Sequence, residues 1–138
     1  MRWWDIPAVA ALEEVCYSAD HWSQESFWGE LAGGHVYRVA DSDGIIGYAG
    51  LSLGFDAANI QTVAVDPGRQ GSGVGGQLVD ALLDEARERH IRVVELEVAS
   101  RNLAARKLYA TRGFTDVGMR RGYYAKDNDD AILMKVAL

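Results

Sequence analysis

The segment Gln70-Gly71-Ser72-Gly73-Val74-Gly75-Gly76 decides how this chain of 138 residues folds. It joins an apolar stretch at 60–65, which predicts a strand, to a stretch at 74–90 whose leucines recur at helical spacing. Glycines at such a junction let successive backbone N–H groups turn toward one anion, beside the positive N-terminal end of the helix. So many glycines in one turn are costly without a purpose, and the segment therefore predicts phosphate binding rather than a plain flexible turn.

The stretches on either side predict two helices first, then antiparallel strands, then alternating helices and strands. In order, they are a short strand at 2–4, helices at 5–19 and 24–31, strands at 35–40, 45–53 and 60–65, a helix at 74–90, a strand at 93–98, a helix at 102–111, and strands at 114–119 and 131–136. Asp5, Ser23 and Asn102 are the expected helix N-caps. This order predicts a single mixed α/β domain over residues 1–138, with a mixed, mostly antiparallel central sheet and helices on both faces.

The composition allows one core and restricts the partners. Hydrophobic residues make up 49% of the chain, and no stretch approaches the roughly 20 apolar residues of a membrane span. The net charge of −6 argues against nucleic-acid binding. The single cysteine, Cys16, excludes an internal disulfide and has apolar neighbours that predict burial, while His21, His35 and His90 lack the spacing of metal ligands. We expect a cytoplasmic monomer without a metal, bound neither to nucleic acid nor to a membrane.

The glycine-rich segment also satisfies the G-x-G-x-x-G pattern of dinucleotide-binding domains, and Glu95 and Glu97 follow at the distance of a ribose-binding acid. Three features argue against that interpretation: the lead-in at 66–70 is longer than a tight strand-to-helix turn, the preceding strands read as antiparallel, and little chain remains for a second half. A Walker A loop is excluded because no lysine follows the glycines. The turn by itself leaves the phosphate ligand open.

The same segment fits the Q/R-x-x-G-x-G/A pattern of the GNAT superfamily of N-acetyltransferases, with Gln70, Gly73 and Gly75 at the fixed places. Further stretches resemble this superfamily: 63–67, 96–98, Asn102, 104–105, 108–109 and 113–114. Arg120-Arg121-Gly122-Tyr123-Tyr124 and the stretch at 130–134 resemble the C-terminal signature of N-terminal acetyltransferases, in particular the bacterial ribosomal-protein-alanine N-acetyltransferases. One departure is Gly71-Ser72, where such enzymes often carry basic residues.

The resemblance implies acetyl-CoA as the co-substrate and a sheet whose strands splay apart where it binds. The strand at 63–65 would pair through its backbone with the pantetheine arm, with the Val65 N–H facing the thioester oxygen, and the glycine-rich turn would hold the pyrophosphate. Asn102 would bond a pantetheine amide, cap its helix, or do both. The implied cofactor-binding residues are Val63, Ala64, Val65, Gln70, Gly71, Ser72, Gly73, Val74, Gly75, Gly76, Asn102 and Tyr109.

Two side chains match the catalytic residues of the superfamily. Tyr109 would protonate the departing thiolate, and a phenol with a pKa of about 10 is a suitable acid. Glu97 would be the general base, although Glu95 lies on the same strand face, and either carboxylate could simply pair with Arg92 or Arg101. An α-amine, with a pKa of about 8, asks less of its base than a lysine amine with a pKa of about 10.4, which favours an N-terminal acceptor.

The resemblance places the acceptor against Trp22, Tyr123 and Tyr124, with both tyrosines in a loop before the last strand; Trp3, Trp4 and Trp28 are expected in the core or in helix packing. The resulting hypothesis is acetylation of the N-terminal alanine of a ribosomal protein by direct attack, since Cys16 lies far in sequence from the motif and gives no support to an acetyl-cysteine intermediate. Two alternatives remain open: acetylation of a small amine such as a polyamine or an antibiotic, and a non-catalytic acyl-CoA-binding module.

Overall fold

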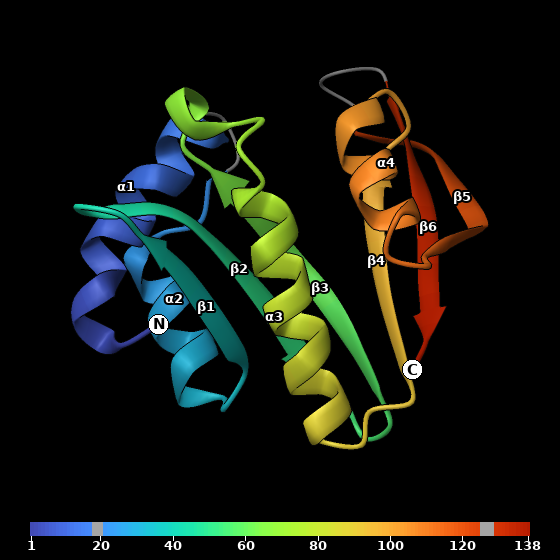
Figure 1. Cartoon of the computed structure of the whole chain (residues 1–138), viewed down its shortest axis with the longest axis horizontal. Coiled ribbons are helices and arrows are strands. Elements are labelled where there is room, and N and C mark those ends of the chain that lie inside the picture. The colour runs from blue at the N-terminus through green and yellow to red at the C-terminus, as the bar shows by residue number, and fades with distance from the viewer. Residues whose placement is uncertain (18–20, 125–128) are drawn as a thin grey trace.

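A six-stranded sheet lies at the centre of the computed structural model, which describes residues 1–17, 21–124 and 129–138 (Figure 1). The strands are β1 (Val36–Asp41), β2 (Ile45–Leu53), β3 (Ala57–Val65), β4 (Val93–Ala99), β5 (Thr115–Tyr124) and β6 (Asp129–Ala137). They are arranged in the order β1-β2-β3-β4-β6-β5, and every neighbouring pair is antiparallel except β3 and β4. The predicted mixed, mostly antiparallel sheet is confirmed.

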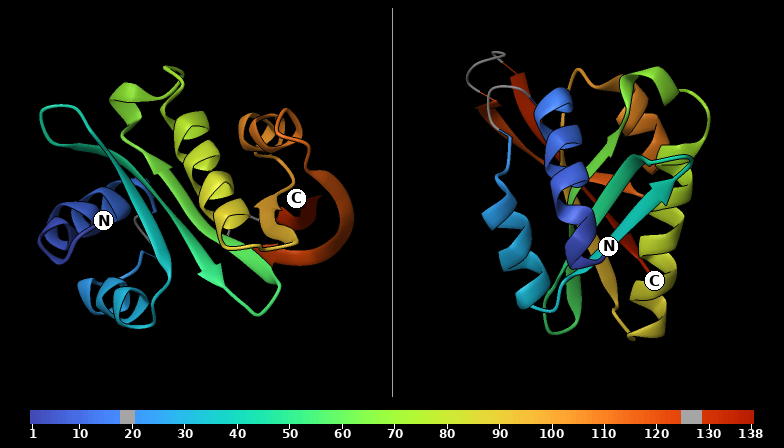
Figure 2. Two further views of the ribbon diagram at one scale, coloured as in Figure 1. Left: turned by 60° about the horizontal axis from the view of Figure 1, so that its bottom comes forward. Right: turned by 90° about the vertical axis from the view of Figure 1, so that its left-hand side faces the viewer.

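Helices cover both faces of the sheet, as expected (Figure 2). Helices α1 (Ile6–Cys16) and α2 (Gln24–Ala32) lie on one face, and α3 (Val74–Glu88) and α4 (Leu103–Ala110) lie on the other. α3 buries its leucines and Ala86 because they recur every three or four residues and so share one helix face. Each fully buried leucine contributes about 1.5–3 kcal/mol to the free energy of unfolding.

The two halves of the sheet separate between β3 and β4. These strands pair only over Ala57–Asn59 and Val93–Glu95, and beyond that point they diverge, so that the gap in Figure 1 widens toward the N-terminal end of α3. A register shift in the β2–β3 pairing leaves Gln61 as an extra residue in β3, and such a bulge bends a strand and increases its twist. The end of β3 therefore has an edge that is paired with no described strand, as the predicted splay requires.

The expected strand at 2–4 is wrong. Trp3–Asp5 form a short 3₁₀ turn that leads directly into α1, because the Asp5 carboxylate accepts the Arg2 N–H at 2.8 Å and the Asp5 N–H donates to the Arg2 carbonyl at 2.9 Å. Asp5 therefore closes that turn and its side chain does not cap α1. The caps at Ser23 and Asn102 are confirmed. α1 ends at Cys16, and its predicted end at Ala19 lies outside the described residues.

The tryptophans expected in the core or in helix packing lie outside the core, on the surface, where Trp3 of the 3₁₀ turn stacks on Trp28 of α2. Trp3, Trp4 and Trp28 are 59%, 53% and 47% exposed. Their rings contact one another, at centroid distances of 5.5 Å for Trp3–Trp4 and 6.4 Å for Trp3–Trp28. The inward positions of α1 and α2 are taken by Ile6 and Phe27, which are fully buried, so the bulkier rings are left outside.

Strand β5 continues beyond its predicted end at Met119. Tyr123 and Tyr124 therefore lie at the end of a strand, not in the loop where the sequence placed them. Gly122 has a φ of +63°, in the region that favours glycine, and the β5–β6 register shifts between Arg120 and Tyr124. This irregularity lets the strand run on while its end changes direction.

Candidate active site

A cavity of about 590 Å³ occupies the gap where β3 and β4 part. Residues from α1 and the segment after it line one side, and residues from α4 line another. The lining residues are Glu13, Cys16, Tyr17, Trp22, Ile60, Gln61, Thr62, Val63, Leu96, Glu97, Val98, Ala99, Asn102, Ala105, Tyr109 and Tyr124. Because α1 and α4 lie on opposite faces of the sheet, the cavity brings groups from both faces together, and two reactants that approach from opposite faces can meet there.

The backbone of Val63 and Val65 points into this gap. The Asp66 N–H donates to the Ile46 carbonyl at 2.7 Å, so Asp66 directs its backbone toward β2. Because backbone groups alternate in direction along a strand, Ala64 also faces β2, whereas the N–H and C=O groups of Val63 and Val65 face the opposite edge of β3. Side chains already use their carbonyl groups. Tyr17 Oη donates to the Val63 carbonyl at 2.9 Å, and Gln70 Nε2 donates to the Val65 carbonyl at 3.2 Å.

Ala64 lies between the two valines and faces the opposite way. Its backbone is directed to Tyr48 of β2, and its side chain is 3% exposed in the core beneath α1. Of the predicted strand segment 63–65, Val63 lines the cavity, the backbone of Val65 faces the open edge of β3, and Ala64 is used for packing.

The glycine-rich turn lies where β3 ends and α3 begins. Gly71 and Gly73 have φ angles of +82° and +89°, and Gly73 is the N-cap of α3, so the turn depends on the left-handed conformation that glycine adopts without strain. An added Cβ would meet nothing within 4 Å at either position. The first N–H groups of α3 have no partner within the helix, and they adjoin this open surface. The predicted phosphate-binding segment is thus an exposed turn at a helix N-terminus.

Close packing explains the last glycine of the turn. An added Cβ at Gly76 would collide with the guanidinium group of Arg112, which also forms an ion pair with Asp80 at 2.8 Å. Arg112 thereby links the end of α4 to α3 on the face where the turn lies.

The structure separates the two candidate base residues. Glu97 lines the cavity, whereas Glu95 is exposed and sits at the last β3–β4 pair, opposite Asn59, before the strands part. Neither expected partner, Arg92 or Arg101, forms an ion pair with Glu97. Its carboxylate pairs with Arg120 of β5 instead, with 3.3 Å between Oε1 and Nη2.

Tyr109 and Asn102 line the wall formed by α4. The Tyr109 ring is 7% exposed and packs edge-on against Phe114, with 5.7 Å between ring centroids. Burial raises the pKa of the Tyr109 phenol, which therefore stays protonated at neutral pH. The Asn102 side chain accepts the Ala105 N–H at 3.1 Å, so this residue caps α4 and lines the cavity as well.

Sequence reasoning missed the wall formed by α1. Glu13 is 3% exposed, and its carboxylate accepts hydrogen bonds from the Trp22 N–H, at 2.9 Å, and from the Tyr48 hydroxyl. It could have been found as a charged residue in the apolar stripe of a predicted helix, since it lies seven positions after Ile6 and four after Val9.

Cys16 also lines the cavity, although it lies far along the chain from the glycine-rich turn and the strand before it. It is half-buried, and its thiol lies 3.5 Å from the Val65 carbonyl. Burial raises the pKa of this thiol, and that of the neighbouring Tyr17 phenol to about 12. Both groups are therefore protonated at neutral pH, and Cys16 lacks the thiolate form that a nucleophile requires.

The predicted acceptor residues are divided between cavity and surface. Trp22 and Tyr124 line the cavity, and burial raises the pKa of Tyr124. Tyr123 is 51% exposed and lies outside the cavity lining, with its ring edge-on to Tyr124 at 5.0 Å.

Within residues 1–17, 21–124 and 129–138, no group of His, Cys, Asp and Glu side chains could hold a metal ion. Over the same residues, no helix has the length and apolar character needed to cross a membrane.

Comparison with known proteins decides the family. Residues 2–114 match the acetyltransferase (GNAT) family. The chain belongs to this family. The predicted GNAT fold and acetyltransferase activity are confirmed, and the antiparallel strands that precede the turn set aside the dinucleotide-binding alternative.

Relatives within the GNAT family match nearly the whole chain. It is 40% identical over 138 residues to the N-alpha-acetyltransferase RimI of Mycobacterium tuberculosis, a match that covers 95% of this chain and 85% of the relative. It is 32% identical to the [Ribosomal protein bS18]-alanine N-acetyltransferase of Salmonella typhimurium, over 97% of this chain and 92% of the relative. The crystal structure of the ribosomal-protein-S18-alanine N-acetyltransferase from Escherichia coli superimposes with a TM-score of 0.90 at 29% identity, covering 99% of this chain and 90% of that one.

Proposed function

We propose that this protein transfers the acetyl group of acetyl-CoA to the α-amine of an N-terminal alanine of a ribosomal protein. The observation that carries the proposal is the cavity at the open edge of β3, where Glu97 and Tyr109 line walls formed by β4 and α4. The relatives named for this reaction match the chain over nearly its full length and supply the identity of the acceptor. We place the reaction in the cytoplasm, with a single-domain monomer as the active species.

The residues present fit acetyl-CoA. Its pantetheine arm carries two amide groups, and the outward-facing backbone of Val63 and Val65 can pair with them as a neighbouring strand would, with the carbonyl groups exchanging or sharing the bonds that they accept from Tyr17 and Gln70. Its pyrophosphate suits the turn at 70–76, where open space, left-handed glycines and the N-terminal end of α3 meet. Acetyl-CoA supplies an activated acyl group as a thioester.

Two side chains carry the proton transfers. The nitrogen of the acceptor forms a bond to the acyl carbon while the bond from that carbon to sulfur breaks. Glu97 accepts the proton that the amine loses, directly or through a water molecule, and Tyr109 donates a proton to the departing sulfur. The N–H of Val65 faces the same gap and can donate to the acyl oxygen as it gains negative charge.

We propose direct transfer, without an acyl group on the enzyme. Cys16 does line the cavity, so distance along the chain is no argument against it. Its raised pKa is the argument, because the neutral thiol is a poor nucleophile and must first lose a proton beside the buried carboxylate of Glu13, whose charge raises that pKa further.

The acceptor side lies on the α1 face of the sheet. Trp22, held at its N–H by Glu13, and Tyr124 line the cavity from this side. An α-amine is half deprotonated at a pH of about 8, which suits a carboxylate base better than a lysine amine does. We therefore infer an N-terminal α-amine as the acceptor in preference to a lysine side chain.

The test is release of free thiol from acetyl-CoA by the purified protein with three acceptors. One is a short alanine-initiated peptide copied from a small-subunit ribosomal protein, the second is the same peptide with a blocked N-terminus, and the third is spermidine. Release with the free peptide alone supports the proposal. Release with spermidine alone moves the enzyme to the small-amine class. Tight binding of CoA without turnover of any acceptor favours the acyl-CoA-binding module.

A further inference from the structure

Arg120 reaches the candidate base from another strand. It lies in β5, and β6 separates β5 from β4, which carries Glu97. Arg120 is paired with Ala131 of β6, and Ala131 is paired with Ala99 of β4, so these residues and Glu97 share one face of the sheet. The β6 residue in this row is Ala131, a small side chain that leaves room for the long arginine side chain to cross toward β4.

The ion pair holds only one oxygen of the carboxylate. Arg120 Nη2 lies 3.3 Å from Glu97 Oε1, and Glu97 Oε2 accepts no hydrogen bond from a described residue. The Glu97 side chain is 23% exposed and lines the cavity. One oxygen is therefore anchored on the side of β5, while the other is available to take a proton from a group in the cavity.

Arg120 also contacts the aromatic pair at the end of its own strand. Its guanidinium carbon lies 5.6 Å from the centre of the Tyr123 ring, within the range of a cation–π contact. Tyr123 in turn packs edge-on against Tyr124, which lines the cavity. The same guanidinium group thus contacts the carboxylate of the base and Tyr123, the ring that packs against Tyr124 of the cavity wall.

We propose that Arg120 is a positioning residue for Glu97: it fixes the carboxylate so that its second oxygen faces the acceptor amine. This inference rests on the proposed function, in which Glu97 is the base. A stabilising role alone is a poor explanation, because the Arg120 side chain is 57% exposed and exposed ion pairs contribute only about 0–1 kcal/mol to the free energy of unfolding.

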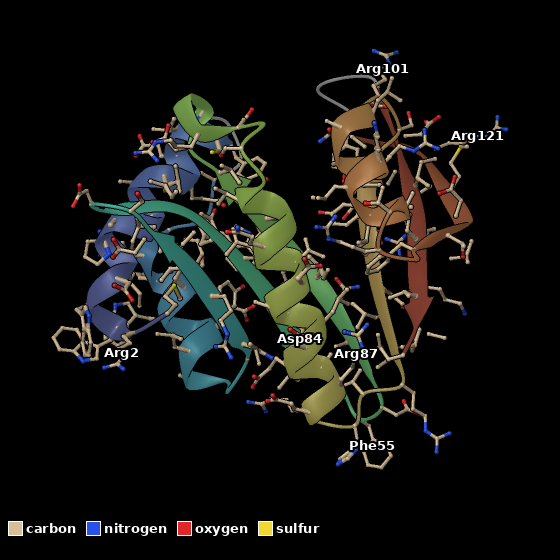
Figure 3. The ribbon with its side chains drawn as sticks, in the orientation of Figure 1. Arg2, Phe55, Asp84, Arg87, Arg101 and Arg121 are labelled. Atoms are coloured by element: carbon tan, nitrogen blue, oxygen red, sulfur yellow. The ribbon has the colours of Figure 1, made fainter. Side chains whose placement is uncertain are left out.

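The chain offers a matched control at the next position. Arg121 follows Arg120 in the same strand and is exposed, and the ion pair with Glu97 is made by Arg120 alone among the described arginines. Figure 3 shows Arg121 extending outward from β5, and it forms no ion pair with a described residue. Replacing either arginine by methionine removes one positive charge from the same strand, but only one replacement releases Glu97.

The experiment compares Arg120→Met, Arg120→Lys, Arg121→Met, Glu97→Gln and the double variant Glu97→Gln/Arg120→Met by thiol release with the alanine-initiated peptide. We expect Arg120→Met to lower kcat about tenfold with an unchanged KM for acetyl-CoA, Arg120→Lys to recover part of that loss, and Arg121→Met to match the parent. The double variant should be no slower than Glu97→Gln alone, because both changes act on one group.

The outcomes separate this inference from the proposed function. Impaired turnover of Glu97→Gln together with normal turnover of Arg120→Met would overturn the role of Arg120 and leave the function intact. Equal losses of kcat in Arg120→Met and Arg121→Met would also overturn the role of Arg120. So would a loss of kcat in the double variant that equals the product of the two single losses. Normal turnover of Glu97→Gln would remove Glu97 as the base and the role of Arg120 with it.

Discussion

Tyr109→Phe isolates the acid step of the proposed reaction. The substitution keeps the ring, which is 7% exposed and packs on Phe114, and removes only the hydroxyl. That hydroxyl makes no hydrogen bond with a described residue, so its loss leaves none of those residues with an unpaired buried group. We therefore expect little change in the free energy of unfolding, less than about 1 kcal/mol.

The magnitude follows from the role of the phenol. General acid catalysis by a positioned side chain contributes about 10²- to 10⁴-fold to a rate, so the variant should lose that factor in kcat, equivalent to about 2.7–5.4 kcal/mol of barrier. Burial raises the pKa of Tyr109 above its ordinary value of 10.0. The acid form is thus fully present below that value, and titration of Tyr109 should not lower the activity of the parent enzyme between about pH 6 and 9.

Thiol release at saturating peptide and acetyl-CoA measures kcat, and calorimetry measures the affinity for acetyl-CoA. Tyr17→Phe is the control, because Tyr17 is another phenol on the cavity wall whose hydroxyl bonds the Val63 carbonyl at 2.9 Å. Losing that bond costs about 0.5–1.5 kcal/mol and should appear mainly in the affinity for acetyl-CoA. If Tyr109→Phe turned over as fast as the parent, or lost only affinity, Tyr109 would not be the acid.

Two further substitutions test the turn and the end of the sheet. Gly73→Ala puts a side chain at a φ of +89° with open space around it, so its cost is conformational, about 1–2 kcal/mol of stability, and calorimetry should show weaker binding of acetyl-CoA. The control is Gly29→Ala, in open space within α2, which should leave that binding unchanged. Equal affinities of the two variants for acetyl-CoA would contradict a phosphate role for the turn. A hydrogen bond from the Ser100 hydroxyl and backbone N–H groups hold the pKa of Asp129 below 3.8, so this carboxylate stabilises the fold above pH 3.8 and loses that effect as the pH falls through its lowered value. Urea unfolding of Asp129→Asn should therefore show a smaller loss of stability on acidification than the parent, and parallel curves would refute this account.

Much of the site was predictable where chemistry and local geometry coincide. The glycine turn was read correctly as a strand-to-helix junction because positive φ angles and a helix N-terminus are local properties of the chain. The choice between Glu95 and Glu97 as the base was not predictable from local geometry, since both side chains lie on one face of the same strand. Only the point at which β3 leaves β4 places Glu97 in the cavity and leaves Glu95 outside it.

Contacts between distant parts of the chain account for the misses. Nothing in the stretch around residue 17 indicates that Tyr17 donates to the carbonyl of Val63, 46 positions away. The pairing of Glu97 with Arg120 likewise depends on the insertion of β6 between their strands.

By itself, the sequence determined most of the helices and strands, the helix caps at Ser23 and Asn102, the glycine-rich strand-to-helix turn and the family. The tertiary structure decided which backbone groups of β3 face the gap, which carboxylate enters the cavity, that α1 contributes a wall, and that Trp3, Trp4 and Trp28 stay on the surface. The physical reason is that periodicity and turn chemistry act between near neighbours in the chain, whereas a cavity is set by how far strands diverge and by which elements pack across the gap.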